Sequence, residues 1–277
     1  MSRFGSGLGL VNREAKANLA RGFMRAVGMI LWAVRHCFPE GKYGASQLCG
    51  VMACPSDAAF AAAMHMIAYF EQHKTKGILF SANGNTRPVC TSDASNKPDP
   101  DDGLAHAGYT VHWADGPTSS KSSKLKHQGL SSEHNEYMGL TSALRCIVWT
   151  RQLMSEIGIS KLVQQPFVVY GDNIQANRLC KDHFVSTGNQ HIFMPYHWNR
   201  RAVSEGHAIV KWVQTKFNIS DIMTKALNGV TFQRLLSTLC GYGDLKELIR
   251  TLETTSRIHT EAAEARKVEG VSRDTKK

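Results

Sequence analysis

Asp172 lies at a position in the sequence where an acidic side chain could take part in catalysis or metal binding. It closes an apolar run of β-branched and aromatic residues at 167–170 and precedes a helix-like segment. A short unbroken apolar run is typical of a strand covered on both faces. Open α/β sheets place their functional groups just beyond such strands. Asp172 is therefore a candidate site residue; the alternative is that its carboxylate only caps the following helix.

Three further acids have comparable contexts. Asp93 ends a short predicted strand, and Asp221 opens the last predicted helix. Glu136 precedes the apolar Leu140 by one turn of the longest predicted helix, so it shares the buried side of that helix. A carboxylate held against a core needs a cation or a proton. Glu133, in the first turn of the same helix, is explained by the helix dipole, and we interpret it as structural.

These four carboxylates would repel one another if their elements met at one edge of a sheet, unless divalent cations lay between them. Ligands that are all oxygen favour Mg²⁺ or Mn²⁺ over zinc. Two such ions about 4 Å apart can activate a water and stabilise the leaving oxygen when a phosphodiester is displaced. The predicted chemistry is metal-dependent phosphodiester hydrolysis.

The elements that must position these acids follow from periodicity and turn signals. Three strands in series without intervening helices indicate an antiparallel meander. The predicted helices cover residues 22–38, 56–77, 131–158, 174–180 and 193–203 and begin again at 218, and the predicted strands cover residues 78–81, 88–93, 106–113, 122–127, 167–170 and 207–213.

The chain has 277 residues, of which 42% are hydrophobic, enough for one large domain or two modest ones. Its formal net charge is +10, from 33 Lys plus Arg against 23 Asp plus Glu. A balance this basic favours a polyanionic partner, most commonly nucleic acid, although solubility alone is an alternative explanation.

Membrane and secretion signals are missing from the residue pattern. The longest lipid-like run, residues 27–34, falls far short of the roughly 20 residues that span a bilayer, so we predict no membrane partner. The first residues lack the apolar core of a signal peptide. The seven cysteines are scattered without a Cys-x-x-Cys pair, as in reduced intracellular proteins. These features predict an intracellular location, cytoplasm or nucleus.

The motifs around the acids resemble the ribonuclease H domain that ends copia-type retrotransposon polyproteins. The resemblance extends from about Gly22 to about Gly243. Its first part, with residues 27–32 and the helix and strand at 55–81, is similar to the segment between reverse transcriptase and ribonuclease H. Each motif alone is weak, and four in order are specific. The motifs are Thr91-Ser92-Asp93-Ala94, Leu130 to Met138, Tyr170-Gly171-Asp172-Asn173 and Ser220 to Leu227.

The resemblance implies a fold and a set of catalytic residues. The fold is α/β, a ribonuclease H-like mixed five-stranded sheet of order 3-2-1-4-5 flanked by helices and preceded by a small helical connection unit. The implied metal-binding and catalytic acids, for two Mg²⁺ ions with Mn²⁺ as a substitute, are Asp93, Glu136, Asp172 and Asp221. His191 and His197 lie in a stretch that faces substrate in the family; the alternative is that they are satisfied helical histidines.

Two departures from the family pattern affect the expected substrate contacts. Ala94-Ser95-Asn96 stands where the family has Ala-Asp-Trp, and His134 stands where it has a Glu. Neither change removes one of the four acids.

The expected domain organisation has four parts: a flexible leader at 1–21, a helical connection-like segment at 22–84, a ribonuclease H-like domain at 85–243 and a polar helical or disordered tail at 244–277. Within that tail, the apolar positions Leu245, Leu248, Ile249 and Leu252 mark one face of a helix.

Two functions follow. The first is an endonuclease that hydrolyses the RNA strand of RNA–DNA hybrids, with a reverse transcriptase domain of the same polyprotein as a candidate partner. The second is a catalytically inactive remnant or domesticated binding module on the same fold. All four acids favour the enzyme, because a pure binder gains nothing from a cluster that repels phosphate. The candidate nucleic-acid-binding residues are Lys121, Lys124, Lys126, His191, His197, Arg200 and Arg201.

Overall fold

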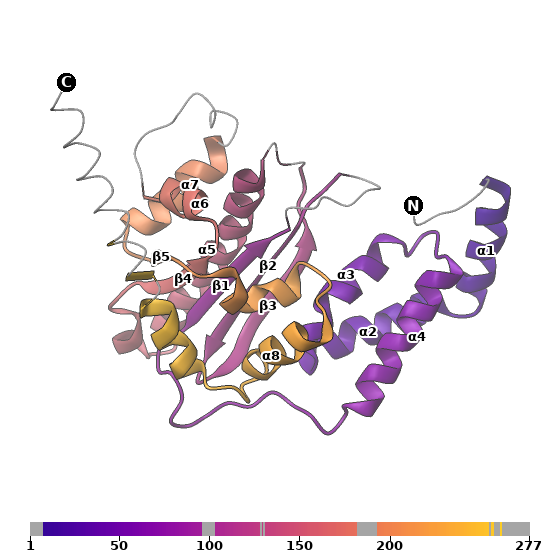
Figure 1. The fold of residues 1–277 in the computed structure, drawn as a ribbon, viewed down its shortest axis with the longest axis horizontal. Helices are drawn as coiled ribbons and strands as arrows, with labels where there is room; N and C mark the ends of the chain where they lie inside the picture. The colour runs from indigo at the N-terminus through magenta and orange to yellow at the C-terminus, as the bar shows by residue number, and fades with distance from the viewer. Residues whose placement is uncertain are drawn as a thin grey trace.

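The computed structural model describes residues 8–95, 103–127, 129, 131–181, 193–254, 256–257 and 261. A mixed sheet with helices on both faces lies beside a separate group of helices from the first third of the chain (Figure 1). The strands are β1 (Val89–Ala94), β2 (His106–Trp113), β3 (Gly116–Lys124), β4 (Phe167–Gly171) and β5 (Ala208–Trp212).

The helices agree with the predicted positions in the main. The α-helices are α1 (Leu8–Ala20), α2 (Phe23–His36), α3 (Lys42–Gly50), α4 (Asp57–Gln72), α5 (Ser132–Glu156), α6 (Ile174–Leu179), α7 (Phe193–Ser204) and α8 (Gly229–Leu239). Short 3₁₀ helices are η1 (Pro39–Gly41), η2 (Ser160–Val163), η4 (Thr215–Phe217) and η5 (Ile219–Met223).

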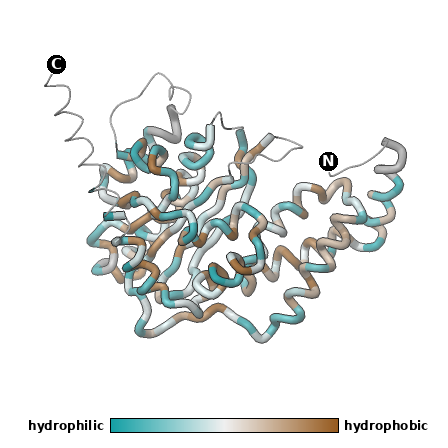
Figure 2. Tube along the Cα trace, in the orientation of Figure 1, coloured by the Kyte–Doolittle hydropathy of each residue, from teal (hydrophilic) through white to brown (hydrophobic). Residues whose placement is uncertain are grey.

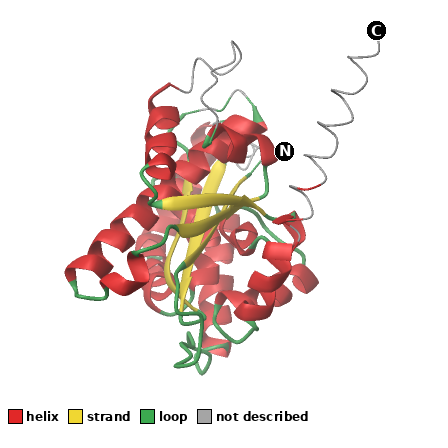
Figure 3. Ribbon diagram, turned by 90° about the vertical axis from the view of Figure 1, so that its left-hand side faces the viewer, coloured by secondary structure: helices red, strands yellow, loops and turns green. Residues whose placement is uncertain are grey.

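The five strands lie in the order β3-β2-β1-β4-β5. β1 pairs antiparallel with β2, and β2 pairs antiparallel with β3. β1 and β4 are parallel, as are β4 and β5. Figure 3 shows this sheet enclosed by helices. The predicted ribonuclease H-like sheet and its strand order are confirmed.

Two different layers cover the two faces of the sheet. Neighbouring residues of β1 point to opposite faces. Cys90 packs in the core with Tyr137 and Leu140 of α5, whereas the hydroxyl oxygens of Thr91 and Ser220 in η5 lie 2.7 Å apart. α5 therefore covers one face, together with α6 and α7, and η5 with α8 covers the other.

The helical unit α1–α4 has a core of its own, formed around the buried residues Phe23, Val27 and Ile30 of α2. Figure 2 shows apolar segments in this unit as well as in the sheet. The unit is tied to the sheet by Lys42, whose Nζ donates to the carbonyl oxygen of Ser120 at 2.7 Å and to its hydroxyl at 2.6 Å. The predicted helical segment before the sheet is thus a packed body that contacts strand β3.

Helix α1 occupies residues where the sequence predicted a flexible leader, and that prediction is wrong for Leu8–Ala20. The buried Asn18 side chain donates to the Pro55 carbonyl at 3.2 Å and to Asp57 Oδ1 at 3.0 Å. Both acceptors are distant in sequence, so local pattern did not reveal the docking of α1.

The predicted strand at 78–81 is not a strand. Its backbone N–H groups bond two unrelated segments, Leu79 to the Cys240 carbonyl at 2.9 Å and Ser81 to the Ala114 carbonyl at 2.7 Å. The third strand begins at Gly116 rather than at 122, because Ala114 and Asp115, with φ of 53° and 67°, form a tight two-residue turn directly after β2.

Residues 245–254 form a helix that packs on the sheet. Leu252 is buried with Val89, Tyr170 and Val213, and Leu245 is buried in the cluster of η5 and α8. The expected apolar face exists, but the predicted boundary at residue 243 separates this helix from the sheet that it covers.

All seven cysteines are free. No helix in the described part of the chain combines the length and the apolar character needed to cross a membrane.

Candidate metal centre

The parallel pairing of β1 and β4 brings two of the predicted acids to one edge of the sheet. Ser92 pairs with Gly171 in the register of these strands. Asp93 is the next residue of β1, and Asp172 directly follows the end of β4, so their carboxylates emerge side by side.

Asp172 does not cap the helix that follows it. The N-cap of α6 is Asn173, whose Oδ1 accepts hydrogen bonds from the backbone N–H groups of Gln175 and Ala176 at 3.0 Å each. The capping alternative is therefore excluded, and the Asp172 carboxylate is directed to other partners.

Glu136 reaches the same edge from the first turns of α5. Ser131 caps this helix, its hydroxyl accepting from the His134 N–H at 3.1 Å. Gly139, one turn later, lets the helix approach β1, because a Cβ there would lie 3.2 Å from the Asp93 carbonyl oxygen. Glu136 Oε2 then accepts from the Ala94 N–H at 3.0 Å.

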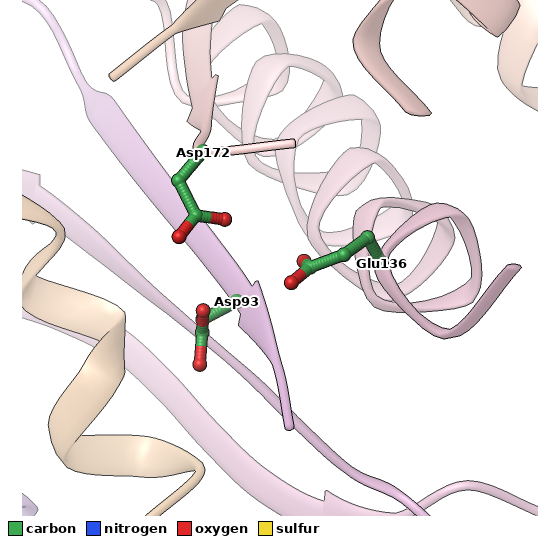
Figure 4. A group of neighbouring side chains, drawn as sticks. All are labelled: Asp93, Glu136 and Asp172. Carbon is green, nitrogen blue, oxygen red and sulfur yellow. The ribbon is translucent and has the colours of Figure 1, made fainter. Parts of the chain in front are cut away.

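Asp93, Glu136 and Asp172 point toward one another (Figure 4). Each offers an oxygen such that the three atoms lie within 4.8 Å of one another. Ligands on opposite sides of one Mg²⁺ are about 4.2 Å apart, since each Mg–O bond is about 2.1 Å. The three oxygens would have to move closer together to share one cation, and a set of carboxylates suits a hard ion.

The electrostatics of this group also fit a cation. Burial, followed by the charges of Asp93 and Asp172, raises the pKa of Glu136 to about 10. Burial and then Asp93 raise the pKa of Asp172. Thr215 donates to Asp172 Oδ2 at 2.9 Å, but the buried Oδ1 has no hydrogen-bond partner among the described residues. Such an oxygen is costly to bury unless a proton or a cation meets it.

Asp221, the fourth predicted acid, lies outside this group of three. It is in the 3₁₀ helix η5 rather than at the start of an α-helix. Asn218 Nδ2 donates to the Ser92 carbonyl at 2.9 Å and fixes η5 on β1. Burial, followed by Asp93, raises the pKa of Asp221 to about 7, against the lowering effect of Lys225. The structure thus places Asp221 beside Asp93, outside the group of three acids.

The predicted basic contacts fall on two elements at opposite edges of the sheet. Lys121 and Lys124 belong to the edge strand β3, and Lys126 follows it. On α7, which packs near β5, His197, Arg200 and Arg201 line a surface pocket of about 420 Å³ with Lys181. Arg201 also pairs with Glu205 at 2.7 Å. His191 lies outside the described residues.

Three residues at the site carried no predicted role. Thr215 bonds Asp172, Thr224 donates its hydroxyl to Asp93 Oδ2, and Lys225 contacts two of the acids. The spacing of Lys225, four residues after Asp221, was a signal for a local ion pair. The threonines act across the fold and left no such signal.

No family model matches the chain. Known proteins do match it: the retrovirus-related Pol polyprotein from transposon RE2 of Arabidopsis thaliana is 32% identical over 196 residues, which are 70% of this chain and 13% of that protein. The corresponding polyprotein from transposon RE1 of the same plant is 30% identical over 202 residues, 73% of this chain and 14% of that protein. This chain is a relative of copia-type Pol polyproteins. The predicted resemblance is confirmed, and the Pol-related chain spans about one seventh of the length of these relatives.

Solved structures similar to this chain include ribonucleases H. A ribonuclease H1 isolated from compost covers 55% of this chain and 99% of its own, with a TM-score of 0.39 and 16% identity. A second structure of that enzyme, in complex with an RNA/DNA hybrid, has a TM-score of 0.38 and 15% identity. The fold assignment rests on the strand order and pairing of the sheet itself.

Proposed function

We propose that the Pol-related chain is a ribonuclease H that cleaves the RNA strand of RNA–DNA hybrids endonucleolytically, with Mg²⁺ bound by Asp93, Glu136, Asp172 and Asp221, and Mn²⁺ as a substitute. The observation that carries the proposal is the meeting of Asp93, Glu136 and Asp172 at the edge where β1 and β4 run parallel. The relation to Pol polyproteins supports a nucleic-acid substrate.

The chain's own residues hold this centre in a fixed geometry. Glu136 is held by the Ala94 N–H and Asp172 by the Thr215 hydroxyl. Asp93, 1% exposed, accepts from the Thr224 hydroxyl. Divalent cations bound by such acids supply an activated water and stabilise the charge on the leaving oxygen. Fixing the ligands beforehand avoids reorganisation during the reaction.

The hybrid would be held mainly through its phosphates. The lysines of β3 and the basic side chains around the α7 pocket are the proposed contacts, and they carry no base recognition. Contacts to 2′-hydroxyl groups would select the RNA strand. A reverse transcriptase domain of the same polyprotein is the proposed protein partner, since the relatives are far longer than this chain.

Cleavage of a labelled RNA–DNA hybrid, with Mg²⁺ and with a chelator, tests the proposal. We expect Mg²⁺-dependent cuts in the RNA strand only. Asp172→Asn should reduce the rate at least about a hundredfold, because it removes charge that the cations require. Asp244→Asn changes an exposed carboxylate that caps the 245–254 helix, and should cleave as the wild type does.

Two results would contradict this proposal. Equal cutting of duplex DNA and of hybrid would rule out RNA-strand selection. Hybrid binding without cleavage in the wild-type protein would favour the inactive binding module.

A further inference from the structure

Lys225 is a basic side chain that contacts two acids of the candidate metal centre, Asp93 and Asp221. Its Nζ lies 3.0 Å from Asp221 Oδ1 and 3.7 Å from Asp93 Oδ2. The side chains of these acids are 8% and 2% exposed, whereas that of Lys225 is 39% exposed. A flexible, partly solvated ammonium thus bridges two buried carboxylates.

The two sides of Asp93 differ in the charge beside their oxygens. Asp221 Oδ1 and Asp172 Oδ1 are both buried without a hydrogen-bond partner among the described residues, but the Lys225 ammonium lies 3.0 Å from Asp221 Oδ1. Toward η5, Asp93 Oδ2 accepts from the Thr224 hydroxyl and faces Lys225. The η5 side of the centre thus has an ammonium in ion-pair contact, and among the residues that the structure describes no ion pair is formed by Asp172.

We propose that Lys225 Nζ occupies the second cation position of the centre. It is a positioning residue that neutralises the Asp93–Asp221 pair. The first divalent cation then binds at Asp93, Glu136 and Asp172, and a second binds only as the ammonium withdraws. This inference rests on the proposed function in one respect, that the centre binds divalent cations.

The physical reason is competition for the same atoms. A cation shared by Asp93 and Asp221 would need the carboxylate oxygens that Lys225 contacts. An ammonium this close to a divalent ion would also repel it strongly in a partly buried site. The four-carbon stem and partial exposure of Lys225 allow the ammonium to move into solvent when that ion binds.

Calorimetric titration with MnCl₂, combined with thermal unfolding in a chelator, tests this role in the full chain. We expect the wild type to bind one Mn²⁺ tightly and a second weakly. Lys225→Met should tighten the second site by about tenfold or more, because the competing charge is gone. The same variant should unfold at a lower temperature without metal, because two buried carboxylates lose their counter-ion.

Two control variants separate the charge from mere packing. Lys225→Arg keeps the cation and should restore the unfolding temperature of the metal-free protein. Lys211→Met removes a lysine that is 33% exposed and pairs with Glu253 at 3.8 Å outside the centre, so it should leave Mn²⁺ binding unchanged. Lys225→Gln gives a second neutral variant should Lys225→Met not fold.

The outcomes distinguish this inference from the proposed function. A neutral variant with the Mn²⁺ titration and unfolding temperature of the wild type would overturn the role of Lys225, while metal-dependent cleavage by the wild type still stood. Tighter second-site binding in that variant, with no hybrid cleavage by the wild type, would support the role of Lys225 and contradict the ribonuclease activity.

Discussion

At the scale of single residues, the crowded carboxylates of the site should make the folded protein less stable as the pH rises. The pKa of Glu136 is raised to about 10 in the folded protein, whereas a free Glu titrates near 4.3. Between these values the folded state binds more protons than the unfolded state, so stability falls as pH rises. We expect urea unfolding of the metal-free protein to show lower stability at pH 8.5 than at pH 7.

Glu136→Gln should remove much of the loss of stability between pH 7 and pH 8.5. We expect it to stabilise the metal-free protein at pH 8.5 by about 1–3 kcal/mol. Glu133→Gln removes a carboxylate of the same helix that is not part of the group of three acids; it is the control and should change little.

Two other groups contribute the opposite slope: His112, buried with its pKa lowered to about 4, between about 4 and 6.5, and Lys42, whose pKa burial lowers to about 8, above about pH 8. Both groups are the same in Glu136→Gln, so the difference between the variant and the wild type reports on Glu136. A Glu136→Gln variant that loses stability at both pH values would show that the carboxylates do not repel as argued.

The acids of the site could be predicted from the sequence more readily than the residues that form hydrogen bonds with them. Asp93 and Asp172 could be predicted because a strand end is visible in a short apolar run, and Glu136 because helical spacing assigns it to the buried side. Thr224 bonds Asp93 from 131 residues away. Contacts of that kind depend on how elements pack, which residue spacing does not encode.

At the scale of elements, η5 must lie very close to the sheet for Asp221 to reach Asp93. Gly108 pairs with Asp93 across β1 and β2. A Cβ at Gly108 would lie 2.3 Å from Met223 Cβ and 2.8 Å from the Lys121 carbonyl oxygen, neither of which can turn aside. The absence of a side chain at Gly108 is what allows η5 to pack here.

We predict that Gly108→Ala displaces η5, destabilises the protein by about 1–3 kcal/mol and lowers hybrid cleavage. Urea unfolding and the cleavage assay measure the two effects. Gly28→Ala, in helix α2 where a Cβ meets nothing within 4 Å, is the control and should be neutral or stabilising by up to about 1 kcal/mol. Wild-type stability and activity in Gly108→Ala would mean that η5 tolerates a shift.

Elements could be predicted where local pattern and tertiary role agree. β4 is a short apolar run buried on both faces, and α5 has a capping serine and a long apolar stripe. Residues 78–81 have the composition of a strand but find no continuous partner. Helix α1 owes its place to distant acceptors of Asn18. These failures share one cause, since pairing and docking partners are set by the whole fold.

At the scale of the whole molecule, the net charge of +10 should make hybrid affinity depend strongly on salt. Removing two lysines of β3 in the double variant Lys121→Ala/Lys124→Ala should weaken binding uniformly across sequences. It should also reduce the slope of log affinity against log salt by about 2, because each neutralised phosphate contributes about 0.9. Titration of a fluorescent hybrid at several salt concentrations measures this slope.

The control for these lysines removes the same charge elsewhere. Lys74 and Lys161 are exposed on α4's C-terminal side and on η2. Lys74→Ala/Lys161→Ala should keep the wild-type slope. An equal change in both double variants would mean that net charge alone, rather than the surface of β3, sets the affinity.

The helical unit α1–α4 and the sheet should depend on each other for stability. Besides the Lys42 contact, the rings of Tyr43 and His106 meet edge-on at 5.0 Å, and the buried Glu40 faces the Cys240 thiol, with Oε2 and Sγ 3.9 Å apart. We therefore predict that a chain beginning at Asn85 unfolds at a lower temperature, binds a hydrophobic dye and self-associates, because the apolar surface beneath α3 and η1 becomes exposed. A chain of residues 8–257 retains every one of these contacts and serves as the control. We expect it to unfold at the same temperature as the full chain. Wild-type unfolding temperature and no dye binding in the chain from Asn85 would show that the sheet and its own helices are stable without the helical unit.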